Sequence, residues 1–195
     1  MASRRHFVQS AGAAALIAAL HPLDALAQTI EQVRIYYGFP AGSSGDSLAR
    51  RVGEKLAGSA YTRNAAVVEN KPGASGRIAL ESLKSAPADG SVLAMAPVSA
   101  MANYPVVYPK LAYDPKDFAP VSIAAIAHHG LAVGPMVPAS VRNVREFLAW
   151  CKEHPQQANY GSPGAGSTPH FLGALLGIHT GTDLKHVPYR GSAPG

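Results

Sequence analysis

The sequence predicts an α/β fold with parallel strands, and two observations lead to this prediction. Short apolar runs alternate with amphipathic helical runs along most of the chain, which is the pattern of a parallel sheet. A turn rich in glycine and serine also occurs twice, at residues 39–46 and 160–167, each time between a predicted strand and a predicted helix. Such a turn presents backbone N–H groups at a helix N-terminus, where the helix dipole attracts anions. We therefore expect two lobes of the protein that close on a small acidic ligand.

The predicted elements of the first part are a strand at residues 33–37, a helix at 47–57, a strand at 65–68, a helix around 78–83 and a strand at 92–95. The first helix places Leu48, Val52 and Leu56 on one side, as expected of a helix that packs on a sheet. Four prolines between Tyr104 and Pro120 exclude a long regular element there. We expect an ordered connection at that place.

The predicted elements of the second part are extended runs at residues 121–125 and 131–133, a helix at 144–152, a helix from 168 to 177, a strand at 184–187 and a loop at 188–195. Asn143 is placed to cap the first of these helices, and Thr168 with Pro169 to begin the second. Gly177 is the expected stop of that helix.

The first 27 residues have the pattern of an export signal of the twin-arginine type. Arg4 and Arg5 precede an apolar run at residues 11–20, and small residues form a predicted cleavage site before Gln28. An N-terminal membrane anchor is the alternative, but the run is shorter than the roughly 20 apolar residues that cross a bilayer. We expect a cleaved signal and a soluble periplasmic chain.

The charge of the chain gives no reason to expect a nucleic-acid partner. The net charge of +5 falls to +4 without the signal, and the basic residues are scattered rather than gathered in a stripe. Cys151 is the single cysteine, so it cannot form an intramolecular disulfide. It shares a helical face with Val144, Phe147 and Leu148, which predicts that it is packed in the core.

Neither glycine-rich turn fits a known catalytic or nucleotide-binding loop. A nucleophile elbow needs glycine two residues before and after its serine, but Asp46 follows Ser44 and Tyr160 precedes Ser162. The Gly-Lys pair of a phosphate loop and the full dinucleotide pattern are also absent from the sequence. A secreted serine hydrolase that uses Ser44 or Ser162 remains the alternative function.

The six histidines after residue 27 do not have the spacing of a metal site. His128 and His129 are adjacent in an extended run, so they point to opposite faces, and the others are isolated. His170 follows the second turn, where it is either a solvated residue of the first helical turn or a donor at the rim of a pocket. We expect no metal and no cofactor.

Five spaced motifs occur in the chain, at residues 67–76, 88–90, 108–122, 159–162 and 186–194. In this order they resemble the Bug receptors, which are the extracytoplasmic solute receptors of tripartite tricarboxylate transporters. The resemblance implies a type II periplasmic-binding-protein fold, with two Rossmann-like domains and a ligand cleft between them. It implies no catalysis, a small carboxylate as ligand and the membrane permease subunits of the transporter as partners.

The resemblance also implies a domain division. Residues 28–125 correspond to the N-terminal part of the first domain and residues 126–195 to part of the second. Family members run on beyond the last motif, so we expect that this chain is truncated and that the complete receptor is a monomer. A periplasmic sensor input domain of the same fold is a further alternative.

In such receptors the two turns hold one ligand carboxylate, largely through backbone N–H groups and ordered waters. The implied ligand-binding residues are Pro40, Ala41, Gly42, Ser43, Ser44 and Asp46 of the first turn, Ser162, Gly164, Gly166, Ser167 and His170 of the second, and Val98, Ser99 and Tyr189 of the wall. The family usually has Pro-Pro-Gly-Gly in the first turn. Ser43 departs from this pattern and brings a hydroxyl where only backbone is expected.

Overall fold

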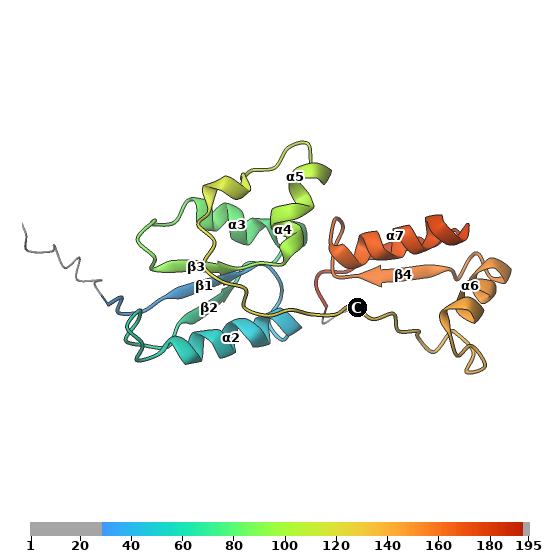
Figure 1. Ribbon diagram of the computed structural model, residues 1–195, viewed down its shortest axis with the longest axis horizontal. Helices are drawn as coiled ribbons and strands as arrows, with labels where there is room; N and C mark the ends of the chain where they lie inside the picture. The colour runs from blue at the N-terminus through green and yellow to red at the C-terminus, as the bar shows by residue number, and fades with distance from the viewer. Residues whose placement is uncertain (1–28, 193–195) are drawn as a thin grey trace, which may run out of the picture.

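The computed structural model describes residues 29–192, which form two parallel sheets with helices packed on them (Figure 1). The first sheet has the order β2-β1-β3, with β1 at Arg34–Tyr37, β2 at Val67–Asn70 and β3 at Val92–Met95. The second pairs β4 (Asn159–Ser162) with β5 (Lys185–Pro188). Every strand pair is parallel, which confirms the predicted α/β class.

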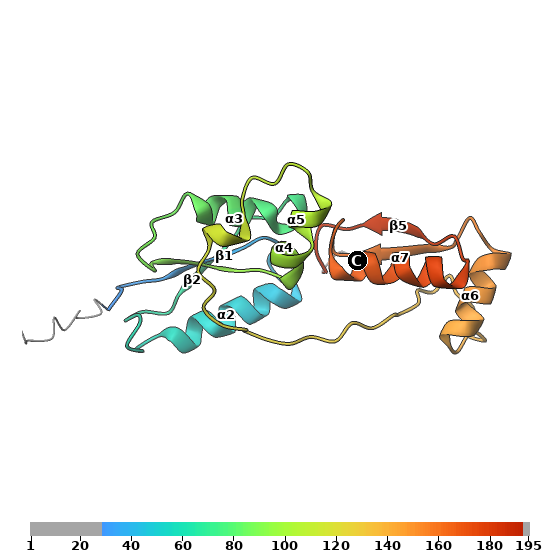
Figure 2. The same cartoon turned by 45° about the horizontal axis from the view of Figure 1, so that its top comes forward.

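Helices α2 (Ser44–Leu56) and α3 (Arg77–Lys84) cover opposite faces of the first sheet (Figures 1 and 2). Ile35 of β1 packs with Ala49 on the α2 side, whereas its neighbour Tyr36 packs with Ala79 on the α3 side. Successive side chains of a strand point to opposite faces. Residues 35–37 are apolar or aromatic because both faces of the strand are buried there, whereas Arg34 at its start is exposed.

The proline-rich connection is ordered and has only short helices, as expected. They are α5 (Tyr104–Val107) and η2 (Pro115–Asp117), and two further short helices, η1 (Ala74–Gly76) and α4 (Val98–Ala102), precede the connection. Tyr104 and Tyr113 pack with Leu80 and Ala100 in a small core beside α3. The Tyr113 hydroxyl donates to the Ala100 carbonyl at 2.7 Å, and burial raises the pKa of Tyr113 to about 12.

Helix α6 (Val144–Glu153) begins as predicted, because the Asn143 side chain accepts the Glu146 N–H. Cys151 is buried against Phe147, Trp150 and Ala158, which confirms its expected place in the core. The expected contribution of Val144 to this face was wrong, because its side chain is 47% exposed.

Helix α7 (Thr168–Thr180) corrects two expectations. Its N-cap is Ser167 rather than Thr168, since the Ser167 hydroxyl accepts the His170 N–H. Gly177 does not stop the helix, which continues to a left-handed cap at Gly181. Position 177 needs glycine for packing instead, because a Cβ there would lie 2.8 Å from the Thr182 carbonyl oxygen.

The extended runs expected at residues 121–125 and 131–133 form no strand within residues 29–192. This segment runs as an exposed connection from the first sheet toward α6 (Figure 2). An extended run becomes a strand only when a neighbour supplies ladder hydrogen bonds. The described part of the chain provides no such neighbour here.

Candidate functional site

The two glycine-rich turns lie at the carboxyl ends of β1 and β4 and lead into α2 and α7. These strand ends point toward one another in the structure (Figure 1). The loop at residues 188–192 joins the two turns. Its Gly191 N–H donates to the Pro163 carbonyl at 3.0 Å, and its Ser192 Oγ lies 3.3 Å from Ser44 Oγ. Ligands of open α/β sheets bind at such strand ends.

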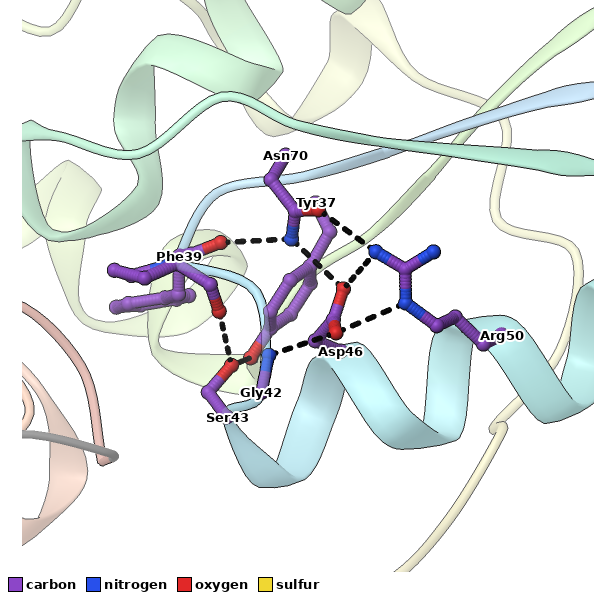
Figure 3. Close-up of polar contacts among 8 residues, drawn as sticks. Tyr37, Phe39, Gly42, Ser43, Asp46, Arg50 and Asn70 are labelled. Carbon is purple, nitrogen blue, oxygen red and sulfur yellow. Dashed lines mark hydrogen bonds and ion pairs between the residues drawn. The ribbon is translucent and has the colours of Figure 1, made fainter.

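A buried carboxylate braces the first turn (Figure 3). Asp46 accepts the Gly42 N–H at 2.9 Å, two guanidinium N–H groups of Arg50 at 3.0 and 3.1 Å, and the Asn70 amide at 2.8 Å. The same amide also donates to the Phe39 carbonyl at 3.0 Å. Asp46 therefore ties the turn to both α2 and the end of β2 and holds the turn in its shape.

The charge of Asp46 is stabilised where it lies. Burial alone would raise the pKa of this carboxyl, but the hydrogen bonds from Arg50, Gly42 and Asn70 outweigh burial and leave the pKa below its ordinary value. Asp46 is therefore ionised at neutral pH, with a positive partner on the exposed side of α2.

Tyr37 and Ser43 fill the space inside the first turn. Ser43 is 1% exposed, and its hydroxyl donates to the Pro40 carbonyl at 2.8 Å and lies 3.4 Å from the Tyr37 hydroxyl. The extra hydroxyl expected to face the ligand is thus used within the turn. A Cβ on Gly45 would collide with the Tyr37 hydroxyl, so this tyrosine requires glycine at the start of α2.

Ser162 is the centre of the second turn. Its hydroxyl donates to the Gly164 carbonyl at 3.0 Å, accepts the Gly164 N–H at 3.2 Å, and lies 2.7 Å from His186 Nε2. His170 Nδ1 accepts the Gly166 N–H at 3.1 Å. Gly166 has a φ of +79°, a conformation that glycine adopts without strain.

These contacts correct the expectation that the turns leave their N–H groups unpaired and pointing outward. The amides with partners inside the turns or in the helix that follows are those of Gly42, Ser43, Gly164, Gly166 and Ser167. The Ser44 N–H is different, because its partner is Ser192 Oγ of the bridging loop, at 3.5 Å. That amide is at the N-terminus of α2, and its partner comes from another part of the chain.

The remaining predicted residues have varied surroundings. Ala41 is exposed, Pro40 is partly buried next to Gly191, and Tyr189 is 39% exposed with its ring edge close to Gly161. Val98 is 71% exposed, but Ser99 beside it is 1% exposed. The Ser99 side chain is therefore packed within the protein, whereas that of Val98 is open to solvent.

The structure adds residues that sequence reasoning missed. Tyr108 donates its hydroxyl to the Ala165 carbonyl at 2.9 Å, and Arg77 lies 3.8 Å over the ring of Tyr108. His186 and Ser192 contact the second and first turns. Both lie in the motif at residues 186–194, but only the fold shows that this motif returns to the turns.

Ser162 and His186 resemble a catalytic serine–histidine pair only in the short distance between their side chains. Ser162 is 5% exposed and its proton is used on the Gly164 carbonyl. The contacts described for residues 29–192 join no carboxylate to His186, although a catalytic triad needs such a group to orient the imidazole.

Within residues 29–192, no three side chains of the metal-binding types gather closely enough to hold an ion. Over the same residues, every helix is too short or too polar to cross a bilayer.

Comparison with known proteins identifies the family. The profile of the tripartite tricarboxylate transporter family receptor matches residues 48–195. The chain belongs to this family. It is a family of receptors, so the expectation of a binding protein rather than an enzyme is confirmed.

Individual members of the receptor family show the same likeness. The UPF0065 protein in the gbd 5' region of Cupriavidus necator is 34% identical over 97% of this chain and 58% of its own length. BugT of Bordetella pertussis is 28% identical over 96% of this chain and 55% of its own. The chain therefore spans just over half the length of these relatives.

Solved structures agree. R. palustris Rpa4515 with adipate has a TM-score of 0.72 and 30% identity over 84% of this chain and 54% of its own. A structure described as a periplasmic transporter has a TM-score of 0.71 and 36% identity over the same shares. The fold predicted from the motifs is confirmed as that of this receptor family.

Proposed function

We propose that this chain is the part of a periplasmic receptor that grips a small carboxylate solute and presents it to the membrane subunits of a tripartite tricarboxylate transporter. One observation carries the proposal: two glycine-rich turns, each of which leads into the N-terminus of a thirteen-residue helix, both contact one loop. Helix N-termini favour anions through their dipole and their N–H groups. Membership of the receptor family and the adipate bound by Rpa4515 support the same ligand class.

The Ser192 hydroxyl suggests where a carboxylate oxygen would lie. Its oxygen is 3.5 Å from the Ser44 N–H and 3.3 Å from the Ser44 hydroxyl, so it takes the position of an acceptor at the N-terminus of α2. A ligand oxygen with a full charge would make a stronger bond to the same donors. Ligand binding would then displace Ser192 from Ser44.

The wider organisation belongs to the same proposal. Residues 28–125 and 126–195 would form parts of two domains that close on the solute, in a receptor that is monomeric when complete. The twin-arginine signal ending before Gln28 would direct the chain to the periplasm; that segment lies outside the described residues.

Changing Arg4 and Arg5 together to lysine should leave the precursor in the cytoplasm, whereas a membrane-retained full-length chain would contradict a cleaved signal.

The direct test is a calorimetric titration with adipate and with adipamide, in which both carboxylates are replaced by neutral amides. Adipate should bind at least a hundredfold more tightly, because several charge-assisted hydrogen bonds are lost in the amide. A thermal shift screen would extend the test to other solutes. Stabilisation only by uncharged sugars would refute a carboxylate receptor.

A further inference from the structure

Two stacked histidines hold the second turn. His170 of α7 and His186 of β5 have ring centroids 3.9 Å apart, with their planes inclined by 28°. Each ring also contacts the turn, His170 through the Gly166 N–H and His186 through the Ser162 hydroxyl. The pair therefore links α7 and β5 to both ends of the turn.

One of these hydrogen bonds has a donor that is fixed by chemistry, because a backbone N–H can only donate. His170 Nδ1 accepts an N–H, so it carries no proton and the ring is uncharged. His186 Nε2 lies 2.7 Å from Ser162 Oγ, a hydrogen bond that either atom can donate according to the tautomer of the ring. A proton added to His170 would face the Gly166 N–H and would also place a charge beside the second imidazole.

The surroundings do not offset such a charge. Tyr160 of β4 packs on His186 at 5.1 Å and donates its hydroxyl to the His170 carbonyl. Across the turn lies Tyr108 with the Arg77 guanidinium on its ring. Among the described residues, neither imidazole has a hydrogen bond or ion pair with a carboxylate. Burial, and after it the neighbouring His170, lower the pKa of His186.

We propose that His170 and His186 are positioning residues of the ligand site, which hold the second turn in its anion-binding shape, with His170 Nδ1 as the acceptor of the Gly166 N–H. A proton added to His170 Nδ1 would remove the acceptor of the Gly166 N–H and loosen the turn. This inference rests on the proposed function for its consequence, which is a solute affinity that falls when His170 Nδ1 is protonated.

The shape of the turn is tested without any ligand, by NMR of the full chain labelled with ¹⁵N. At pH 8, the His170 Nδ1 signal should be that of an unprotonated acceptor, and the Gly166 amide signal should move as the pH falls to 5. In His170→Asn, whose side-chain oxygen can accept the same N–H without titrating, the Gly166 signal should stay in place. A protonated Nδ1 at pH 8, or a Gly166 signal that ignores pH in the native chain, would overturn the proposal.

The consequence is tested by the ratio of adipate affinities at pH 8 and pH 5.5. The native chain should lose about tenfold, whereas the double variant His170→Asn with His186→Gln should change less than about twofold, whatever its affinity at pH 8. The variant His179→Asn removes an exposed histidine from the same helix and should keep the native ratio.

Equal ratios in the native chain and the double variant would count against the proposal. Failure of adipate to bind at any pH would count against the proposed ligand, and the NMR measurement would then decide the role of the histidines.

Discussion

At the scale of single residues, Asp46 is the buried charge on which the first turn depends. Its carboxylate has four donors from Gly42, Arg50 and Asn70. We expect Asp46→Ala to lower the free energy of unfolding by about 2 to 4 kcal/mol, because these donors lose a charged acceptor. Urea denaturation measures the change. The control is Glu31→Gln, which breaks the exposed pair with Arg63 and should change stability by less than about 1 kcal/mol.

The same carboxylate gives stability a dependence on acid. The pKa of Asp46 is lower in the folded chain than its ordinary value, so its contribution is complete above that value and is lost as the pH falls through the folded pKa. We expect the native chain to lose stability below about pH 4 more steeply than Asp46→Asn does. Parallel acid slopes for the two chains in thermal melts would show that Asp46 is not the group responsible.

Ser44 allows the key amide to be removed on its own. It is the first residue of α2, where proline is well tolerated, and Ser43 before it already has the extended conformation that proline requires. Ser44→Pro should weaken adipate binding by about tenfold or more with little change in melting temperature, because one charge-assisted hydrogen bond is lost. Ser44→Ala, which keeps the amide, should lose less. If Ser44→Ala weakened adipate binding as much as Ser44→Pro, the effect would belong to the hydroxyl and not to the amide.

At the scale of elements, periodicity predicted the strands and helices well where both faces of a strand are buried, as in β1 and β3. Periodicity placed the end of α7 wrongly, because it took Gly177 for a helix stop. Glycine is needed there since the chain turns back and brings the Thr182 carbonyl oxygen against the helix. Prediction of the candidate site from the sequence is limited in the same way. The sequence located both turns, but the side chains that occupy their amides come from α2, α7 and within the turns, and the choice of these partners is made by packing.

Two glycines of α7 test this account of the helix. Gly177→Ala should destabilise the chain by at least about 1 kcal/mol, although alanine is the better helix former, because its Cβ would lie 2.8 Å from the Thr182 oxygen. Gly181→Ala meets no atom within 4 Å and should cost only the strain of a φ of +59°, about 1 kcal/mol. Stabilisation by Gly177→Ala in urea denaturation would contradict the packing seen here.

At the scale of the whole molecule, apolar side chains lie uncovered on two surfaces. Val121, Ile123 and Ile126 of the connecting segment are about four-fifths exposed at 80%, 79% and 83%, and Ile178 of α7 is 75% exposed. The chain spans just over half the length of its relatives. We expect residues 28–195 to bind an apolar dye strongly and to self-associate, because exposed patches of this kind promote aggregation.

Joining residues 28–195 to the remaining part of the Cupriavidus necator relative should reduce dye binding and yield a monomer in gel filtration. A short chain that melts cooperatively, binds no dye and remains a monomer would show that these surfaces need no cover.

The central claim is that the N-terminus of α2 binds a carboxylate at the Ser44 amide. The most direct measurement is an NMR titration of the ¹⁵N-labelled chain with adipate and, separately, with adipamide. The account predicts that adipate moves the Ser44 amide signal downfield and shifts Ser192 as it is displaced, while adipamide leaves both signals in place. Saturable adipate binding that leaves the Ser44 amide unmoved, or equal shifts with both compounds, would contradict it.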